Sequence, residues 1–273
     1  MKFAINYVNN DFNTKYIFDN DIYLKYPGFH PSFEEFKNIP KLKNRILLHG
    51  IFPSSGSIFD EHLCDNMDYW AEVFKKNNNK WVSLHFYYED KFCPLDKVEE
   101  VCKSNIQKIR QRLPNIPIII ENVPYQYKNY DWCFKPDVIT YYCNKYDLGF
   151  LLDISHLFVY CKNNNLDVEK YLKKLPLDKL YEIHISGYYI NENGKADDTH
   201  FECFDKIYDM YKKVLNMTNS VKLTSIEYPV YNNIPVVINY LDEISDDEIY
   251  KLQKKQLNKI REIYNNHLYK NTK

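Results

Sequence analysis

Eight short runs of apolar and β-branched residues recur along the chain, and none shows the clean alternation of a half-exposed strand. Near-continuous hydrophobic runs of this kind are typical of parallel strands whose sheet is covered on both faces. We therefore expect strands at residues 3–7, 22–26, 46–49, 81–86, 116–123, 149–154, 180–186 and 222–228.

The later strands are separated by segments that can hold a helix. We expect helices at residues 60–76, 95–112, 135–145, 167–174 and 201–215. The first two connections are short and irregular, so early helices there are expected to be missing or degenerate. The alternation predicts an α/β fold, a (β/α)8 barrel in a single domain over residues 1–273. Residues 245–273 form a helical extension, with an amphipathic helix at 245–268 that is expected to cover the barrel exterior.

A doubly wound open sheet is the structural alternative. Such a fold binds dinucleotides through a Gly-x-Gly-x-x-Gly loop that follows a strand. This chain has six glycines and no such loop, so the barrel is favoured.

Composition excludes several classes of protein. The 36 basic residues nearly balance the 37 acidic residues, which argues against a broad basic field for nucleic acid or anionic membranes. No apolar run approaches the roughly 20 residues of a membrane helix, and the N-terminus resembles a strand rather than a signal peptide. The seven cysteines form no Cys-x-x-Cys pair and are expected to be reduced and buried. We therefore expect a soluble, cytoplasmic protein.

Imidazole and carboxylate side chains recur at the carboxyl ends of the predicted strands. In a (β/α)8 barrel these ends converge on one mouth, which holds the active site. Asp198 and His200 lie in the loop expected after the seventh strand. The nine candidates are His49, His85, Glu121, Asp153, His156, His184, Asp198, His200 and Glu227.

Four carboxylates in one small volume oppose each other through desolvation and repulsion, and metal ions remove this conflict. The donors are nitrogen and oxygen only, which suits Fe, Mn or Zn. With one bridging carboxylate, nine residues suit up to three ions at about three or four protein ligands each. Three divalent ions would leave a positive surplus that can hold hydroxide or an anionic substrate, which favours catalysis over a closed structural site.

The segments that carry these residues resemble the DUF692 family. These are multinuclear non-heme iron-dependent oxidative enzymes (MNIO) with a xylose-isomerase-like TIM barrel. The resemblance covers about residues 46–229 and is weaker over the first forty residues. It rests on Leu48-His49-Gly50, Ser83-Leu84-His85-Phe86, Glu121-Asn122-Val123, Leu151-Leu152-Asp153-Ile154-Ser155-His156, Glu182-Ile183-His184-Ile185-Ser186-Gly187, Asp198-Thr199-His200 and Ile226-Glu227.

The resemblance implies a role for each candidate. His49 and His85 would bind one metal, and Glu121 would bridge it to a second. The second metal would be completed by Asp153, His184 and Glu227, and a third would be held by His156, Asp198 and His200. Glu121 and Asn122 are the expected catalytic residues, with Asn122 either supporting the ligands or contacting the substrate.

The resemblance also implies the chemistry and the partners. The family modifies ribosomally synthesised precursor peptides (RiPP biosynthesis), with O2 as co-substrate and cysteine as a known target. The substrate thiolate binds a mixed-valent Fe(II)/Fe(III) pair, so two or three iron ions are expected. Many members need a small partner protein that presents the peptide. Neither nucleic acid nor a membrane is an expected partner.

Three other functions stay open. A three-zinc phosphodiesterase of the endonuclease IV type shares the ligand order, but four arginines offer few phosphate contacts. A sugar isomerase with two metals would leave several ligands idle. A non-catalytic peptide-binding or metal-storage module would not need a partly open ligand set.

Overall fold

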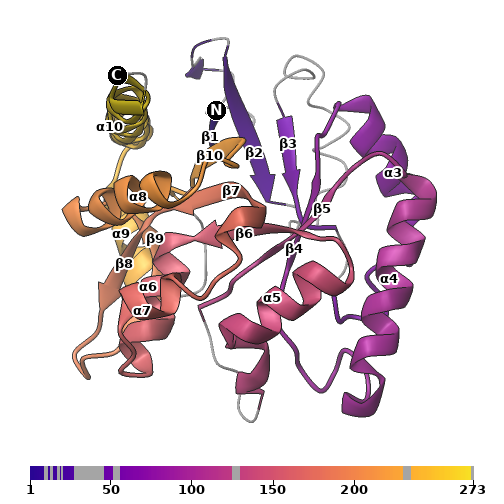
Figure 1. Ribbon diagram of the computed structural model, residues 1–273. Coiled ribbons are helices and arrows are strands. Elements are labelled where there is room, and N and C mark those ends of the chain that lie inside the picture. The colour runs from indigo at the N-terminus through magenta and orange to yellow at the C-terminus, as the bar shows by residue number, and fades with distance from the viewer. Residues whose placement is uncertain are drawn as a thin grey trace.

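The protein forms a nearly closed barrel of eight parallel strands (Figure 1). The computed structural model describes residues 1–8, 12, 15, 16, 19, 21–27, 46–51, 56–124, 130–229 and 235–271. The strands pair in the order β3-β2-β1-β10-β7-β6-β5-β4. Their bounds are β1 Lys2–Asn6, β2 Ile22–Pro27, β3 Ile46–His49, β4 Val82–His85, β5 Ile118–Glu121, β6 Gly149–Asp153, β7 Leu180–Ile185 and β10 Leu223–Ile226.

The two end strands of this order, β3 and β4, are joined by hydrogen bonds of the chain that follows β3. The Gly50 amide donates to the Ser83 carbonyl at 3.1 Å, and the His85 amide donates to the Gly56 carbonyl at 2.9 Å. Ser57 also pairs with His85 in parallel. The segment after β3 thus brings the ring almost to closure, and the predicted barrel is confirmed.

Eight helices surround the barrel in the described part of the chain. Figure 1 shows α3, α4 and α5 on one side of the sheet and α6 to α9 on another. Their bounds are α3 Met67–Lys76, α4 Val98–Arg112, α5 Pro136–Lys145, α6 Ile154–Asn163, α7 Val168–Leu172, α8 Asp205–Met217, α9 Pro235–Glu243 and α10 Asp246–Asn271; short 3-10 turns cover Leu95–Lys97, Asp131–Phe134 and Leu177–Lys179.

Several predicted boundaries were wrong. The helix expected from residue 60 begins at Met67, and the one expected from residue 201 begins at Asp205. The sequence does not predict helix α6, because the apolar run over residues 149–154 is typical of a strand and does not show where β6 ends. The helix starts directly after β6, where the Asp153 side chain accepts a hydrogen bond from the His156 amide and caps the helix. The early connections lie mostly outside the described residues.

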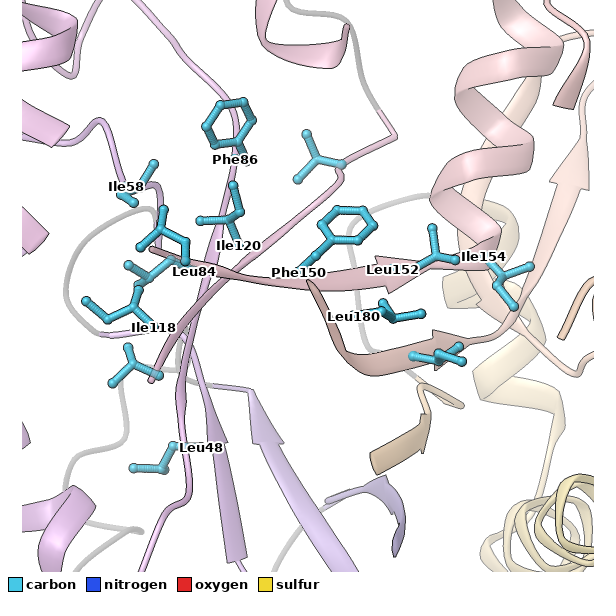
Figure 2. Close-up of a cluster of buried hydrophobic side chains, with 14 of the residues drawn as sticks. Leu48, Ile58, Leu84, Phe86, Ile118, Ile120, Phe150, Leu152, Ile154 and Leu180 are labelled. Carbon is cyan, nitrogen blue, oxygen red and sulfur yellow. The ribbon is translucent and has the colours of Figure 1, made fainter. Parts of the chain in front are cut away.

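The strands alternate between two environments, although their sequences do not alternate. One set of side chains packs outward against the helices in the main hydrophobic core, as Figure 2 shows for Ile118 and Ile120 of β5 and for Phe150 and Leu152 of β6. The intervening residues point into the barrel because successive side chains of a strand face opposite sides. Both faces are buried, which explains the unbroken hydrophobic runs.

The interior of the barrel changes from apolar to polar along the barrel axis. Ala4, Leu47 and Leu223 form a small separate apolar cluster, with Tyr23 and Trp81 packed against it. Two residues further along β3 and β10, on the same face, the interior residues are His49 and Ser225, and Ser225 is level with His184 of β7. The apolar cluster therefore closes one end, and the carboxyl ends of the strands carry the polar groups.

Helix α10 packs against the barrel wall beside β1 and the N-terminus (Figure 1). Leu257 and Ile260 are buried in the main core, and the buried Gln253 side chain donates to the Asn6 and Tyr228 carbonyls at 3.3 and 2.7 Å. The expected C-terminal helix is present. Among the described helices, none has the length and apolar character needed to cross a bilayer.

Candidate metal centre

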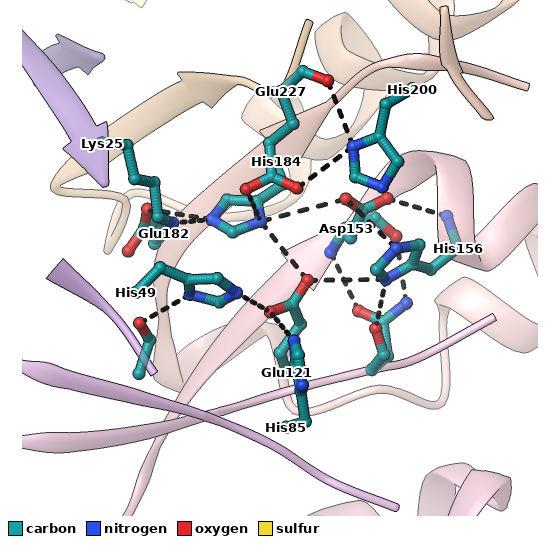
Figure 3. A network of polar contacts seen from close by, with 12 residues as sticks. Lys25, His49, His85, Glu121, Asp153, His156, Glu182, His184, His200 and Glu227 are labelled. Carbon is teal, nitrogen blue, oxygen red and sulfur yellow. Dashed lines mark hydrogen bonds and ion pairs between the residues drawn. The ribbon is translucent and has the colours of Figure 1, made fainter. Parts of the chain in front are cut away.

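The barrel strands bring six of the nine candidate residues to one end of the barrel. His85 and Glu121 are neighbours in the register of β4 and β5, and Asp153 and His184 are neighbours in that of β6 and β7. His49 ends β3, and Glu227 follows β10 directly. Because all these strands are parallel, their carboxyl ends meet, and Figure 3 shows the side chains converging.

Glu121 lies at the centre of this group, with its two oxygens facing different imidazoles. Oε2 lies 3.1 Å from His49 Nε2 and 3.6 Å from His85 Nε2. Oε1 lies 3.3 Å from His184 Nδ1 and 3.4 Å from His156 Nδ1. A carboxylate whose oxygens face two separate sets of nitrogen donors has the geometry of a bridge between two cations.

A second group of donors surrounds His184 Nδ1. Glu227 Oε1 lies 3.1 Å from this nitrogen, and Asp153 Oδ2 lies 3.9 Å from it. Glu121, Asp153, His184 and Glu227 are all buried and can offer four ligand atoms within 4.8 Å of one another. His49, His85 and Glu121 form another such set.

The third group is His156, Asp198 and His200, and its setting differs from the prediction. Asp198 and His200 do not lie in a loop; they lie in β9 (Ala196–Phe201), which pairs antiparallel with β8 (Gly187–Ile190). His156 lies in the first turn of α6. Asp198 Oδ2 is 3.2 Å from His156 Nε2 and 3.0 Å from His200 Nε2. His200 has a positive φ of 50°, a strained conformation for this residue type.

Partners on the far side of the rings set which nitrogen faces the centre. His49 Nδ1 lies 2.8 Å from Ser83 Oγ, so its Nε2 faces Glu121. His200 Nδ1 lies 3.1 Å from the Glu227 carbonyl, so its Nε2 faces Asp198. Such partners fix ring orientation in metal sites.

Asn122 ties β5 to the start of α6. Its side chain donates to the Asp153 carbonyl at 3.0 Å and accepts from the Asp153 amide at 2.9 Å. Its own carbonyl lies 2.8 Å from His156 Nδ1. The side chain is therefore occupied by the Asp153 backbone, and the main-chain carbonyl contacts His156, which favours the supporting role over substrate contact.

Sequence reasoning missed two charged residues that lie against this centre. Lys25 of β2 and Glu182 of β7 are 2% and 1% exposed and form an ion pair at 2.5 Å. Glu182 Oε1 also lies 3.0 Å from His184 Nε2. The available signal was a single charge inside each of two otherwise apolar strands, because a buried charge requires a partner.

Burial and neighbouring charges shift the pKa values of several side chains in the cluster. Burial acts against a charged imidazole at His200, but the Asp198 carboxylate outweighs it and raises the pKa of His200 to about 9. His85 lacks such a balance, and burial lowers its pKa to about 4. Burial raises the pKa of Asp153 to about 6. The Asp198 carboxylate thus favours positive charge at His200, whereas burial outweighs the Glu121 carboxylate at His85.

The donor set fits metal ions. Both Glu121 oxygens, Asp153 Oδ2 and His184 Nδ1 are buried and have no hydrogen-bond partner in the described part of the chain. Leaving such atoms unsatisfied is costly, and a cation among them would satisfy all of them at once. Nitrogen and oxygen donors of this kind suit Fe, Mn or Zn. The seven cysteines are free and buried, as expected, and none joins these sets.

Two other histidines lie outside the centre. The His62 and His267 side chains are paired at the surface with Asp65 and Asn216. His30 lies outside the described residues.

Comparison with known proteins identifies the family of the chain. Residues 29–253 match the family described as RiPP precursor modification enzyme MbnB/TglH/ChrH. A UPF0276 protein of Acaryochloris marina is 27% identical over 230 residues, covering 78% of this chain and 79% of that protein. A UPF0276 protein of Vibrio parahaemolyticus is 28% identical over 191 residues, covering 63% and 65%.

Solved structures share the fold. The IOLI protein with a bound zinc atom superposes with a TM-score of 0.64 at 14% identity, covering 98% of this chain and 99% of that one. A xylose isomerase domain protein from Planctomyces limnophilus gives 0.63 at 10% identity, with 98% of each chain covered. At these identities the likeness establishes a xylose-isomerase-like TIM barrel.

Proposed function

Because the chain belongs to the MbnB/TglH/ChrH family of RiPP precursor modification enzymes, we propose that it is an iron-dependent oxidoreductase. It uses O2 to modify a ribosomally synthesised precursor peptide, and the modified residue is a cysteine. A small partner protein presents the peptide. Family membership supports the peptide substrate, and the donor set supports the metal.

The observation that carries the proposal is the placement of Glu121. Oε2 faces His49 and His85 and Oε1 faces His184, at 3.1–3.6 Å, and both oxygens are buried without a hydrogen-bond partner in the described residues. This geometry suits a carboxylate shared between two ions. A closed structural site would need one ion and fewer donors.

The chain's own residues have three tasks in this proposal. His49, His85 and Glu121 would hold one ion; Glu121, Asp153, His184 and Glu227 a second; and His156, Asp198 and His200 a third. Iron bound here supplies one-electron chemistry with O2 and a site for a peptide thiolate. Asn122 contacts both Asp153 of the second group and His156 of the third, and would hold the two groups in fixed positions relative to each other.

The test begins with protein purified without oxygen. Metal analysis should find two or three iron ions per chain. The protein is then mixed with O2 and a short cysteine-containing peptide encoded beside its gene, with and without the product of any small neighbouring gene. Peptide-dependent O2 consumption together with a mass change on the cysteine-containing fragment supports the proposal.

Other outcomes separate the alternatives. Bound zinc with cleavage of abasic DNA would favour the phosphodiesterase. Metal or peptide binding without turnover would favour a non-catalytic module. Iron in the centre with O2 consumption but no change on cysteine would retain the oxidoreductase and reject the target residue.

A further inference from the structure

A buried ion pair lies inside the barrel, one layer below the proposed centre. Glu182 and His184 are two positions apart on β7, so both side chains point into the barrel. Lys25 reaches the same place from β2, and Figure 3 shows it beside Glu182 and His184. Neither charge is within reach of solvent, since Lys25 is 2% and Glu182 is 1% exposed.

Three nitrogen donors contact the Glu182 carboxylate. Its Oε1 lies 2.5 Å from Lys25 Nζ and 3.0 Å from His184 Nε2, and its Oε2 accepts from Trp81 Nε1 at 2.7 Å. Lys25 Nζ also contacts His184 Nε2. An ammonium and an imidazole N–H cannot donate to each other, so the Glu182 carboxylate is the acceptor that allows them to lie together.

The contacts leave His184 Nε2 two roles, because it can accept from the Lys25 ammonium or donate to Glu182 Oε1, and only the second role leaves Nδ1 free to bind a metal. If Nε2–H donates to Glu182, the lone pair of the ring is on Nδ1. Nδ1 is buried, has no hydrogen-bond partner among the described residues, and faces Glu227 Oε1 at 3.1 Å and Glu121 Oε1 at 3.3 Å. Lys25 balances the charge of Glu182, so the pair orients the ring without changing the net charge around the ions.

We infer that Lys25 and Glu182 are positioning residues that hold His184 with its Nδ1 lone pair toward the second metal group. The inference rests on the proposed function only in that it requires a metal centre. A carboxylate that accepts from the far nitrogen of a histidine ligand raises the ligand's basicity, and its loss typically weakens metal binding 10–100-fold.

The test uses Co(II) as the probe, titrated without oxygen into metal-free protein and followed by its visible absorption. Lys25→Met with Glu182→Leu removes both charges together, so neither is left buried alone. We expect this double variant to fold, as checked by circular dichroism and thermal melting. It should bind one Co(II) about 10–100-fold more weakly, with an altered spectrum for that ion alone.

Two controls make the result specific. Trp81→Phe removes a donor from the far oxygen of Glu182 but leaves the His184 contact, so Co(II) affinity should change less than about threefold. Lys25→Met with Glu182→Gln keeps an acceptor for His184 and should recover part of the lost affinity. Should the double variant fail to fold, Lys25→Met with Glu182→Gln decides the matter by the same titration: weaker binding of one Co(II) than in the wild-type protein supports the positioning role, and wild-type affinity overturns it.

The possible failures are distinguishable. Unchanged Co(II) affinity and spectrum in the folded double variant would overturn the positioning role while leaving the metal centre intact. Wild-type protein that binds neither Co(II) nor iron would overturn the centre itself.

Discussion

The donors of the proposed centre come from two regions that differ in how firmly the fold holds them. His49, His85 and Glu121 end barrel strands whose backbones pair with neighbours and whose outward side chains pack in the main core. Asp198 and His200 lie on the two-stranded β8–β9 sheet, which is outside the barrel ring. We call these the strand donors and the hairpin donors.

We expect the strand donors to be held rigidly and the hairpin donors to be able to move. Strand donors are fixed by packing, so we expect their geometry to persist without metal. The hairpin donors include a residue at positive φ and depend on contacts with α6 and Glu227. We therefore expect the third ion to be the one most easily lost, and the predictions below test this expectation.

Glu121→Gln should have the largest effect. Gln keeps the volume but offers one neutral oxygen, so the bridge between the first two groups is lost. Metal analysis after iron loading should show the loss of at least two ions per chain. Full occupancy would refute the bridging role. Glu202→Gln, near the hairpin base, is the matched control because Glu202 belongs to none of the donor sets, and it should keep all ions.

Asp198→Asn should remove one ion and leave two. Asp198 Oδ2 faces both His156 Nε2 and His200 Nε2, so the third group alone loses its charged donor. The measurement is the iron count together with the Co(II) spectrum of the remaining sites. If the first two sites also empty, the three groups act as one unit and the division into two regions is wrong.

Gly187→Ala should weaken binding of the third ion indirectly, by shifting the base of the hairpin. A Cβ at this position would lie 2.3 Å from the Glu202 carbonyl oxygen, so the base of the hairpin must shift. We expect a loss of about 1–3 kcal/mol in the free energy of unfolding and weaker binding of the third ion only.

Gly194→Ala is the comparison for that variant. Gly194 has φ +73° and open space around its Cβ position, so Ala costs about 1–2 kcal/mol of local backbone strain. Gly194 lies in the turn before β9, away from Asp198, so the metal count should be unchanged. Equal metal loss in both glycine variants would mean that the hairpin responds as a whole rather than through its base.

Lys255→Ala should have the smallest effect. Its ammonium pairs with Glu202 at 2.8 Å, but the lysine side chain is 71% exposed, so the pair contributes about 0–1 kcal/mol. Thermal melting should shift little and the iron count should not change. A lost ion would show that α10 supports the hairpin donors directly.

The same two regions differ in how well the sequence predicts them. The strand donors follow apolar runs, and a parallel barrel places all strand ends together, so His49 and Glu121 could be predicted from position alone. The hairpin was missed, although Asn193-Gly194 is a strong hairpin-turn signal. Tyr189 and Ile190 are followed by a polar stretch rather than by another apolar run, so the second strand of the hairpin has no hydrophobic signal.

Lys25 and Glu182 were missed for a different reason. Each lies inside an apolar run, and the sequence does not show that the two charges meet across the barrel. Their pairing depends on β2 and β7 lying on facing parts of one barrel, which is a property of closure and not of either strand. Likewise, helix α6 follows β6 without a break because Asp153 is both the last strand residue and the helix cap.

The most direct measurement is a crystal structure of protein loaded with iron without oxygen, with an anomalous difference map at the iron absorption edge. The account predicts one peak among His49, His85 and Glu121 and a second among Glu121, Asp153, His184 and Glu227, with the two Glu121 oxygens contacting different peaks. Iron-loaded crystals with no peak in these groups, or with Glu121 contacting none of the ions, would contradict it.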